Sequence, residues 1–426
     1  MDGRAASLTV TDKIPYLLEA GISLTAISAV TGEKDTRFTH YQLLPWGPSG
    51  LRFDFRHLMA RKYGKGWLYK ILTPLLSLIL LPFTVLERLV FGLSSQSSWA
   101  LPAAFKGISL VRKGQVNLVY SSAAAWSGNL AGWIIKKFTG VMWIAEIHDP
   151  MIIRDDPSDD GTRPRVTRDK RFLQRLEKMI CRDADYVWWF TQGALHYAKL
   201  RNPELGDKGF VVFPGAEPPG CHAPFVQNKS EGVAMRTLNL CHFGSLAEDR
   251  SIAPVLRAMH EFFKTHPQAK EKIKIHVYGA ALDKVSRETI QELHMEANVI
   301  AHGRIENDPV TGKSGRERIM EIMRGADVLL LLHGDYEWCA EYIPSKSYDY
   351  YWSKSAIWGI TNRNPELDEI LQARNCYLSH TLDSASILNA LELLWVDWNN
   401  NTLRSQVFLP ITPKDAVEAI LQKISA

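Results

Sequence analysis

Three charged residues stand close together in the segment EYIPSKSYDYYWSKSAIWGI, which begins at Glu341. Lys346 follows the Pro344-Ser345 pair, and Asp349 comes shortly after the lysine. Proline suits the first turn of a helix, because its missing N–H would have no partner there. The amides of Ser345 and Lys346 would then lie at a helix N-terminus, where free amides bind anions. The segment therefore predicts an anion site.

The two carboxylates flank this predicted anion site. Asp349 lies one turn into the helix, where a carboxylate can accept hydrogen bonds from both hydroxyls of a ribose. Glu341 lies in the loop before the helix, available to hold sugar hydroxyls. A sugar nucleotide has hydroxyls at both ends and a diphosphate between them, so the spacing predicts a site for such a ligand.

A second candidate motif is CHFGSLAEDRS, residues 241–251. Gly244 and Ser245 follow an apolar strand pattern, and a glycine lets the backbone turn tightly and approach a phosphate closely. Arg250 precedes the next predicted helix, where a guanidinium could bind a diphosphate with two hydrogen bonds. An ordinary turn with a surface arginine is the alternative interpretation.

Alternating strands and helices are expected to position these candidate site residues. From about Thr237 onward, continuous apolar segments alternate with helical segments, which is typical of a parallel sheet covered on both faces. The first half of the chain has the same alternation in a less regular form. The predicted strands are TLNLCHF, KIHVYG, NVIAHG, DVLLLLH and AIWGI in the second half, and GISLTAISAV, VNLVYSS, MWIAEIH, YVWWFT and FVVF in the first.

The fold class that follows is α/β, with two Rossmann-like doubly wound domains facing a cleft. We expect an N-terminal domain over residues 1–215, a C-terminal domain over 232–408 and a last helix within 409–426. The segment PGAEPPGCHAPFVQNKSEG between the domains is rich in Pro and Gly, as an inter-domain linker should be. Ligands bind such sheets at the carboxyl ends of the strands, so the site residues are expected at that edge.

Composition and charge narrow the class of protein. Five widely spaced cysteines, none in a CxxC pair, argue against a disulfide framework or a zinc knuckle and favour a reducing cytosol. The N-terminus has no signal-peptide pattern. Residues 1–215 contain 28 Lys/Arg against 19 Asp/Glu, and residues 50–113 contain 10 against 2. These basic residues cluster around an apolar run, which argues against a nucleic-acid binder.

The apolar run ILTPLLSLILLPFTVL, residues 71–86, carries no charge. It is shorter than the roughly 20 residues of a spanning helix, and Pro74 and Pro82 interrupt it. Two interpretations stay open: a helix pair buried in a domain core, or a monotopic segment in a membrane interface with the basic cluster on anionic headgroups. A true span fits less well.

Several segments together resemble GT-B glycosyltransferases of the family-4 type. Glu341-x7-Asp349 is similar to the Glu-x7-Glu motif of that family, and FGSLAEDRSIAPVLRAM resembles its glycine turn before a helix. RGADVLLLLH is similar to the strand before the motif, and VYSSAAAWSGNLAGWIIKKFTGVMWIAEIHDPM resembles a first-domain unit that ends in a His-Asp element. The resemblance covers residues 116–375 in the right order.

The resemblance implies a hexosyltransferase that moves a sugar from a nucleotide-sugar donor to an acceptor with retention. It implies no metal at the reaction centre, and no cofactor beyond the nucleotide sugar itself. The donor-binding residues that it implies are Gly244, Ser245, Pro344, Ser345 and Asp349.

The same resemblance assigns catalytic roles. Glu341 would bind the donor sugar, Lys346 would bind the diphosphate, and Arg250 would neutralise the leaving phosphate as the glycosidic bond breaks. His148, at the end of a first-domain strand, would face the transferred sugar, and Asp149 would lie on the acceptor side. A loop histidine with satisfied hydrogen bonds is the alternative for His148.

Some positions depart from the family pattern. The second carboxylate is the shorter Asp349, Pro344 replaces a glycine, and Ser245 stands where many members have arginine. The usual first strand and glycine-rich loop are not evident. Either SLTVT, residues 7–11, is a degenerate first strand, or the sequence begins after that strand.

The charge and apolarity of residues 50–113 also suggest the class of acceptor. In this architecture the first domain takes the acceptor, so residues 50–113 suggest a lipid-linked saccharide or another polysaccharide-pathway acceptor at a membrane surface. The protein would be cytoplasmic and peripheral at the inner face of the cell membrane. The charged segment 154–170 is either a solvated loop or a lid beside the cleft. Alternative functions are a non-catalytic GT-B partner protein and a sugar-nucleotide epimerase of the same fold.

Overall fold

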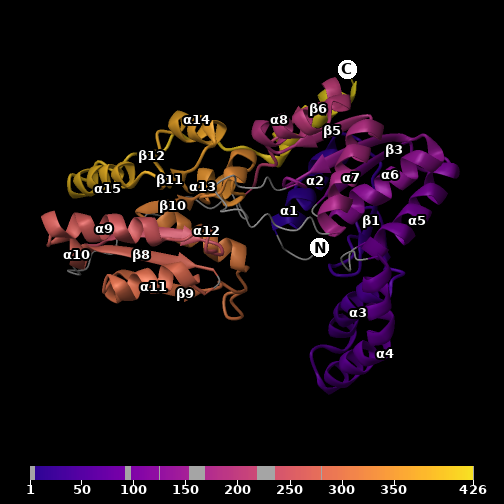
Figure 1. Cartoon of the computed structure of the whole chain (residues 1–426), viewed down its shortest axis with the longest axis horizontal. Coiled ribbons are helices and arrows are strands. Elements are labelled where there is room, and N and C mark those ends of the chain that lie inside the picture. Colours follow the sequence, from indigo (N-terminus) through magenta and orange to yellow (C-terminus); the bar gives the residue numbers. More distant parts are fainter. Residues whose placement is uncertain are drawn as a thin grey trace. The chain divides into compact units, whose positions relative to one another are not determined.

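The computed structural model describes residues 5–91, 97–123, 125–152, 168–217, 236–279 and 281–425. The chain forms two compact units. Unit 1 comprises Met1–Pro214 together with Pro413–Ala426, and unit 2 comprises Gly215–Thr412. Figure 1 gives the element labels used below.

Unit 2 is built on a six-stranded sheet in which every pair of neighbouring strands is parallel (Figure 1). The strand order is β12-β11-β10-β7-β8-β9. The strands are β7 (Leu238–Phe243), β8 (Ile273–Tyr278), β9 (Val299–Gly303), β10 (Val328–Leu332), β11 (Ala356–Thr361) and β12 (Tyr377–His380). All residues of β10 and β11 are buried, as their continuous apolar sequences require.

Helices connect these strands and supply much of the core of unit 2. Leu256 of α9, Ile290 of α11 and Leu391 of α15 belong to one apolar cluster with residues of the strands. The helices are α9 (Ala253–Thr265), α10 (Ala269–Lys272), α11 (Lys284–Glu292), α12 (Gly315–Gly325), α13 (Lys346–Ser353), α14 (Pro365–Ala373) and α15 (Ser384–Asn399), with short 3₁₀ helices η3 (Glu296–Asn298) and η4 (Glu337–Glu341).

Unit 1 contains a four-stranded parallel sheet in the order β3-β4-β5-β6, and a separate parallel pair, β1-β2. The strands are β1 (Thr25–Ala29), β2 (Thr39–Leu43), β3 (Leu118–Ala123), β4 (Met142–Ile147), β5 (Tyr186–Trp189) and β6 (Gly209–Val211). In the register of the larger sheet, Ser122 lies opposite Glu146, and Glu146 lies opposite Trp188. The α/β prediction is thus confirmed for both units.

The helices of unit 1 pack on both faces of its larger sheet. Leu176 and Ile180 of α7 pack with Trp143 on one face, and Ile420 of α16 packs with Ile144 on the other. The helices are α1 (Ala5–Thr11), α2 (Ile14–Glu19), α3 (Pro48–Tyr63), α4 (Trp67–Phe91), α5 (Ala100–Arg112), α6 (Trp126–Thr139), α7 (Arg168–Asp183), α8 (Gln192–Arg201) and α16 (Pro413–Ser425), with η1 (Ser97–Trp99) and η2 (Pro203–Lys208).

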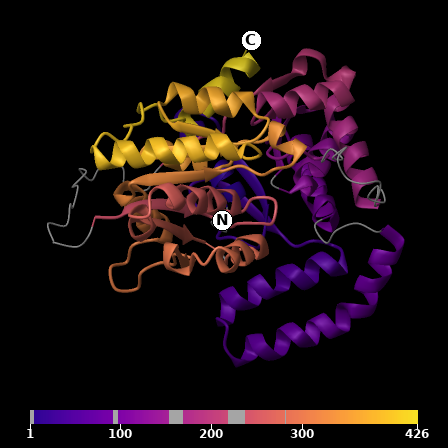
Figure 2. The ribbon, with the colours of Figure 1, turned by 60° about the vertical axis from the view of Figure 1, so that its left-hand side comes forward.

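Helices α3 and α4 lie side by side as a hairpin (Figures 1 and 2). Helix α4 continues through Pro74 and Pro82 as one helix of 25 residues, so the prediction that the prolines interrupt this run is wrong. Each proline removes one backbone hydrogen bond, and the remaining bonds on both sides hold the helix. Its section Trp67–Leu89 is long and apolar enough to cross a membrane, yet only 11% of the most apolar window is buried. Burial of this run in a domain core is therefore contradicted.

The N-terminal segment is helical where a degenerate strand was one of two expectations. SLTVT belongs to α1 rather than to a strand. A strand needs a partner for its backbone groups, and a local preference of β-branched residues does not supply one. Two predicted segments lie largely outside the described residues: the inter-domain linker 214–232, of which residues 218–232 are not described, and the charged segment 154–170, of which residues 154–167 are not described.

Candidate functional site

The strand order of unit 2 fixes where a ligand would bind. From β7 the chain adds β8 and β9 on one side and then returns to add β10 on the other side. The direction of the sheet therefore switches between β7 and β10. In doubly wound sheets the carboxyl ends of the strands open into a crevice at this switch point, and ligands bind there.

The turn after β7 occupies the switch point. Gly244 has φ = +106°, a conformation that glycine adopts far more easily than other residues. Its amide donates to the carbonyl of Tyr278 at 2.8 Å. A Cβ on Gly244 would lie 3.4 Å from Nζ of Lys346, so the backbone passes directly beside this ammonium. Ser245, the next predicted residue, is exposed.

Lys346 is held beside this turn by a histidine that the sequence did not reveal. Nζ of Lys346 lies 3.1 Å from Nε2 of His242, and Nδ1 of His242 lies 3.2 Å from the carbonyl oxygen of Leu330. The lysine is a donor, so Nε2 accepts and Nδ1–H donates to the carbonyl. Burial lowers the pKa of His242 well below its usual value, and the neighbouring Lys346 and Arg250 lower it further. His242 is therefore neutral and orients the lysine.

Arg250 adds a second cation to the same edge. Its Nη2 approaches the carbonyl oxygen of Ser245 at 3.4 Å, and among the described residues its buried Nε has no hydrogen-bond partner. Burial lowers the pKa of Lys346 well below its usual value, and the positive charge of Arg250 adds to this effect. A bound anion would stabilise both charges, so the edge is prepared for an anionic group.

Helix α13 begins two residues later than the proline rule predicted. Lys346 is its first residue, Ser345 is the N-cap, and Pro344 precedes the cap. The amides of Ser347 and Tyr348 donate to the carbonyls of Pro344 and Ser345 in a tight first turn. Among the described residues, the amides of Ser345 and Lys346 donate to no acceptor in the chain. These two amides are the ones that the sequence predicted for anion binding.

Asp349 lies one turn into α13 and has a partner from α12. Oδ1 of Asp349 is 3.5 Å from Nη2 of Arg316, and both side chains are about 30% exposed. The same Nη2 donates to the carbonyl of Glu217 at 2.6 Å. Arg316 thus faces the Asp349 carboxylate, and both side chains are partly exposed.

Glu341 is buried, in contrast to the open loop position that the sequence suggested. It ends η4 and is 1% exposed. The loop that carries it is anchored by His333, whose Nε2 donates to the carbonyl of Tyr342 at 3.2 Å, and by Asn364, which donates to the carbonyl of Cys339 at 2.9 Å. Glu341 is therefore closed off from solvent in this conformation of the loop.

His148 and Asp149 lie in unit 1, directly after β4, whereas the other predicted site residues lie in unit 2. His148 is 8% exposed, and its ring stacks on Phe190 with 4.7 Å between ring centroids. It is therefore well anchored. Beneath it lies a buried pair, Lys13 and Glu146, that no sequence motif indicated.

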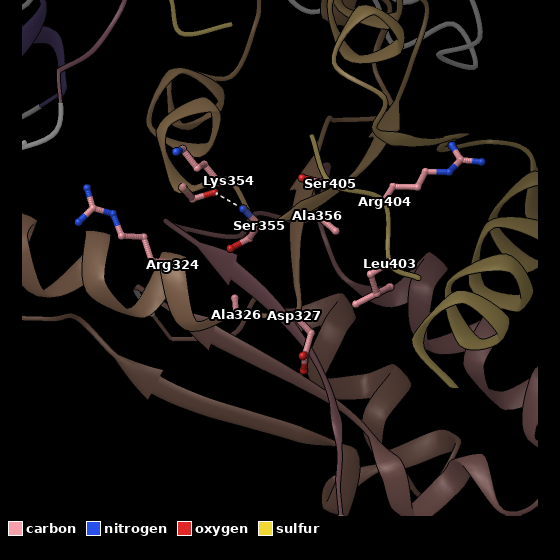
Figure 3. A pocket seen from close by; sticks show the side chains of 10 residues that line it. Arg324, Ala326, Asp327, Lys354, Ser355, Ala356, Leu403, Arg404 and Ser405 are labelled. Carbon is pink, nitrogen blue, oxygen red and sulfur yellow. Dashed lines mark hydrogen bonds between the residues drawn. The ribbon is translucent and has the colours of Figure 1, made fainter. Parts of the chain in front are cut away.

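A cavity of about 290 Å³ lies at the opposite edge of the unit 2 sheet (Figure 3). Asp327 and Ala356, which line it, stand at the amino ends of β10 and β11. The guanidinium groups of Arg324 and Arg404 extend to opposite sides of the view rather than converging on a common point (Figure 3). None of the switch-point residues Gly244, Arg250 and Lys346 lines this cavity.

Two of the residues that sequence reasoning missed share one signal: each is polar where an apolar residue is expected. His242 and Glu146 interrupt apolar strand patterns and are 0% exposed. A polar side chain inside a strand must find a partner, and a strand end is where that partner can belong to a site. Among the described residues, no group of three or more His, Cys, Asp or Glu could hold a metal ion.

No protein-family model matches the sequence, and no curated protein matches it either. Solved structures match in fold. The trehalose-6-phosphate synthase OtsA aligns over 100% of this chain and 95% of its own chain, with a TM-score of 0.56 and 10% identity. Anabaena Alr3699/HepE in complex with UDP aligns over 76% of this chain and 78% of its own, with a TM-score of 0.51 and 13% identity. These likenesses confirm the fold: two Rossmann-like domains of the GT-B type.

Proposed function

We propose that this protein is a glycosyltransferase that binds a nucleotide sugar at the carboxyl edge of the unit 2 sheet. The observation that supports this most directly is the meeting of Gly244, Lys346 and Arg250 at the switch point. Nζ of Lys346 lies beside the Gly244 turn, the charge of Arg250 acts on Lys346, and among the described residues the amides of Ser345 and Lys346 donate to no acceptor. A diphosphate matches this arrangement in charge and in hydrogen-bond acceptors. HepE, which shares the fold, has been solved in complex with UDP.

The rest of the donor follows from the direction of α13. Asp349 lies one turn beyond Lys346, so a nucleotide whose diphosphate rests on Lys346 brings its ribose to the Asp349 carboxylate. Arg316 holds that carboxylate in place. Glu341 would bind the transferred sugar after the loop that carries it has shifted. His148 would contact a hydroxyl of the transferred sugar.

The proposed reaction is sugar transfer with retention and without a metal at the reaction centre. Negative charge grows on the leaving diphosphate as the glycosidic bond breaks, and Arg250 and Lys346 would stabilise that charge. Both side chains are placed before the donor binds, so little reorganisation is needed during the reaction. No cofactor beyond the nucleotide sugar enters the proposal.

The proposal extends to an acceptor at a membrane surface, such as a lipid-linked saccharide, and to a peripheral position at the inner face of the cell membrane. Helix α4 supports it, because its apolar side chains face solvent: Trp67, Leu78 and Leu89 are 69%, 67% and 70% exposed. Exposed basic residues accompany this surface on α3, on the connection and at the start of α4, and they suit anionic headgroups. They are Arg56, Arg61, Lys62, Lys65 and Lys70.

Calorimetric and thermal-shift binding of UDP-, GDP-, dTDP- and ADP-sugars tests the donor site. We expect saturable binding of one nucleotide family, and a loss of affinity of about tenfold or more in Asp349→Ala, since a hydrogen bond to a charged group is removed. Glu288→Ala, an exposed carboxylate on α11 in the same unit, is the matched control and should bind as the wild type does.

Two other outcomes distinguish the alternatives. A folded protein that binds none of the nucleotides contradicts the proposal and favours a non-catalytic partner protein. A protein that binds a nucleotide sugar and inverts the sugar at C2 without any acceptor is an epimerase, and product analysis by NMR separates this result from transfer.

A further inference from the structure

One face of the larger sheet in unit 1 carries a chain of linked polar side chains. Glu146 is near the end of β4 and His148 directly follows that strand, so alternation places both on one face. Ser122 of β3 lies opposite Glu146 in the register and contributes to the same face. Lys13 directly precedes α2, and its side chain reaches this face from outside the sheet.

Glu146 is the centre of this chain. Its carboxylate oxygens lie 3.0 and 3.1 Å from Nζ of Lys13, and the hydroxyl of Tyr120 donates to it. Glu146 is 0% exposed and Lys13 is 2% exposed. Removing both charges from water costs several kcal/mol per ion, and packed apolar side chains often stabilise a fold equally well. Stability alone therefore does not account for the pair.

His148 also contacts the carboxylate of Glu146. Its Nε2 lies 2.6 Å from Oε1 of Glu146 and 2.8 Å from Oγ of Ser122. Burial alone would raise the pKa of Glu146, but Lys13, His148 and Tyr120 outweigh burial and lower the pKa to about 2. An ionised carboxylate only accepts hydrogen bonds, so Nε2 must carry the proton. In the neutral form of the ring, Nδ1 is then the acceptor.

We propose that Glu146 is a positioning residue for His148: it fixes the imidazole in the tautomer with the proton on Nε2, and Lys13 holds Glu146 in place. The inference rests on the proposed function, in which His148 faces the transferred sugar. In that role the remaining nitrogen, Nδ1, accepts a hydrogen bond from a sugar hydroxyl. Stacking on Phe190 fixes the plane of the ring, and Glu146 fixes which nitrogen is bare.

Nitrogen NMR of the histidine side chains tests the tautomer without any substrate. The protein is labelled with ¹⁵N-histidine, and the His148 signals are assigned by their loss in His148→Ala. We expect a protonated Nε2 and a bare Nδ1 in the wild type. The test variant combines Lys13→Met with Glu146→Leu, which removes both charges and retains apolar volume. Only the Ser122 hydroxyl, which donates or accepts, would then contact Nε2, so both tautomers should be populated.

Two further variants separate positioning from structure. Lys13→Met with Glu146→Gln restores an acceptor oxygen and should restore most of the Nε2–H form. If the leucine variant fails to fold, the tautomer of the wild type still tests the inference. Glu177→Gln removes another buried carboxylate of unit 1, one that binds Arg201 at 2.9 Å, and should leave the His148 signals unchanged. A wild type with the proton on Nδ1, or a folded leucine variant with the tautomer unaltered, overturns the inference.

Kinetics relate the tautomer to transfer. In the leucine variant we expect kcat to fall by about tenfold or more, because a wrong tautomer removes an interaction of the reaction centre. The KM for the nucleotide sugar should change by less than about threefold, since the nucleotide binds in unit 2. If the wild type binds no nucleotide, the proposed function fails while the NMR experiment still decides the tautomer. An unchanged kcat beside an altered tautomer also contradicts the inference.

Discussion

Gly244 is the residue at which backbone geometry and chemistry depend most closely on each other. Its positive φ excludes an unstrained Cβ, and the space that a Cβ would fill lies beside the Lys346 ammonium. A side chain here would therefore have two separate effects. It would strain the turn, and it would crowd the place where we expect a phosphate.

Gly244→Ala should separate these effects when it is compared with Gly303→Ala. Gly303 also has a positive φ, +71°, but nothing lies within 4 Å of the position of its Cβ. Both variants should lose about 1–2 kcal/mol of unfolding free energy through backbone strain. Only Gly244→Ala should also lose UDP affinity. Urea unfolding and calorimetry measure the two quantities, and an equal loss of UDP affinity in both variants would contradict a phosphate site at Gly244.

Lys346→Met should abolish UDP binding without lowering the stability of the ligand-free protein. The ammonium is costly in the ligand-free protein, because burial and Arg250 both lower its pKa. Methionine keeps most of the volume without the charge. We expect an unchanged or higher Tm without ligand, and no increase in Tm on addition of UDP. A variant that is both less stable and still stabilised by UDP would place the anion site elsewhere.

The site residues were predictable only as far as their chemistry is local. Gly244, Lys346 and Asp349 follow strands or begin a helix, and their neighbours in sequence set their environment. Their partners His242 and Arg316 come from other elements, and no spacing in the sequence brings them together. The burial of Glu341 was also unpredictable, because it depends on contacts of its loop with His333 and Asn364.

At the scale of elements, α4 is unusual because its sequence is apolar but most of its surface is exposed to solvent. A 25-residue apolar helix that packs chiefly against α3 leaves most of its surface to solvent. Such a surface binds water poorly, and a membrane interface would remove it from water. The charges lie at the ends of the run and on α3, where they can remain in the headgroup region.

Leu78→Glu combined with Leu89→Glu should abolish binding to lipid vesicles. Both leucines are highly exposed, so the substitutions cost the fold little, but they place two charges on the apolar surface. Co-sedimentation with vesicles containing anionic phosphatidylglycerol measures the effect. Phe138→Glu is the control, because Phe138 is 64% exposed at the end of α6, away from the hairpin sequence. Its vesicle binding should equal that of the wild type.

Two further results would decide whether charge contributes. Binding to vesicles of neutral phosphatidylcholine should be weaker, and 1 M NaCl should reduce binding to the anionic vesicles, since salt screens exposed charges. If the double glutamate variant binds vesicles as strongly as the wild type, α4 is not the membrane contact.

Elements with a clear pattern of apolar residues were predictable. Elements that depend on strand pairing or on tertiary packing were not. Five of the six strands of unit 2 were predicted, most clearly β10 and β11, because a short, continuous apolar run between two helices is typical of a buried parallel strand. The short edge strand β12 (Tyr377–His380) was missed. SLTVT resembles a strand because β-branched residues favour one, but α1 forms instead. The local proline rule predicts breaks in α4, because it does not count the helical residues on either side.

At the scale of the whole molecule, we expect mild acid to lower the stability of unit 2. Burial lowers the pKa of His333 from 6.5 to about 3, and His242 is lowered in the same direction. Both are neutral in the fold, while unfolded histidines take up protons below about pH 6.5. Unit 2 should therefore be fully stable above pH 6.5 and lose up to about 1 kcal/mol per histidine per pH unit as the pH falls towards 5.

Hydrogen exchange of the β10 and β11 amides at pH 7 and pH 5, corrected for intrinsic rates, measures this change. We expect faster opening at pH 5 in the wild type and a smaller acceleration in His333→Gln, which cannot be protonated. Equal opening free energies at the two pH values in the wild type would mean that these histidines do not control the stability of unit 2.

The assignment of α16 to unit 1 bears on how the chain is made. Ala416 and Ile420 complete the face of the sheet that includes Ile144 and Trp188, yet they leave the ribosome after every residue of unit 2. Throughout synthesis of residues 215–412, unit 1 must wait with an uncovered apolar face, while unit 2 can finish folding first. The C-terminal half thus matures before the N-terminal half, and a nascent chain stalled before residue 413 would be an early substrate for chaperones.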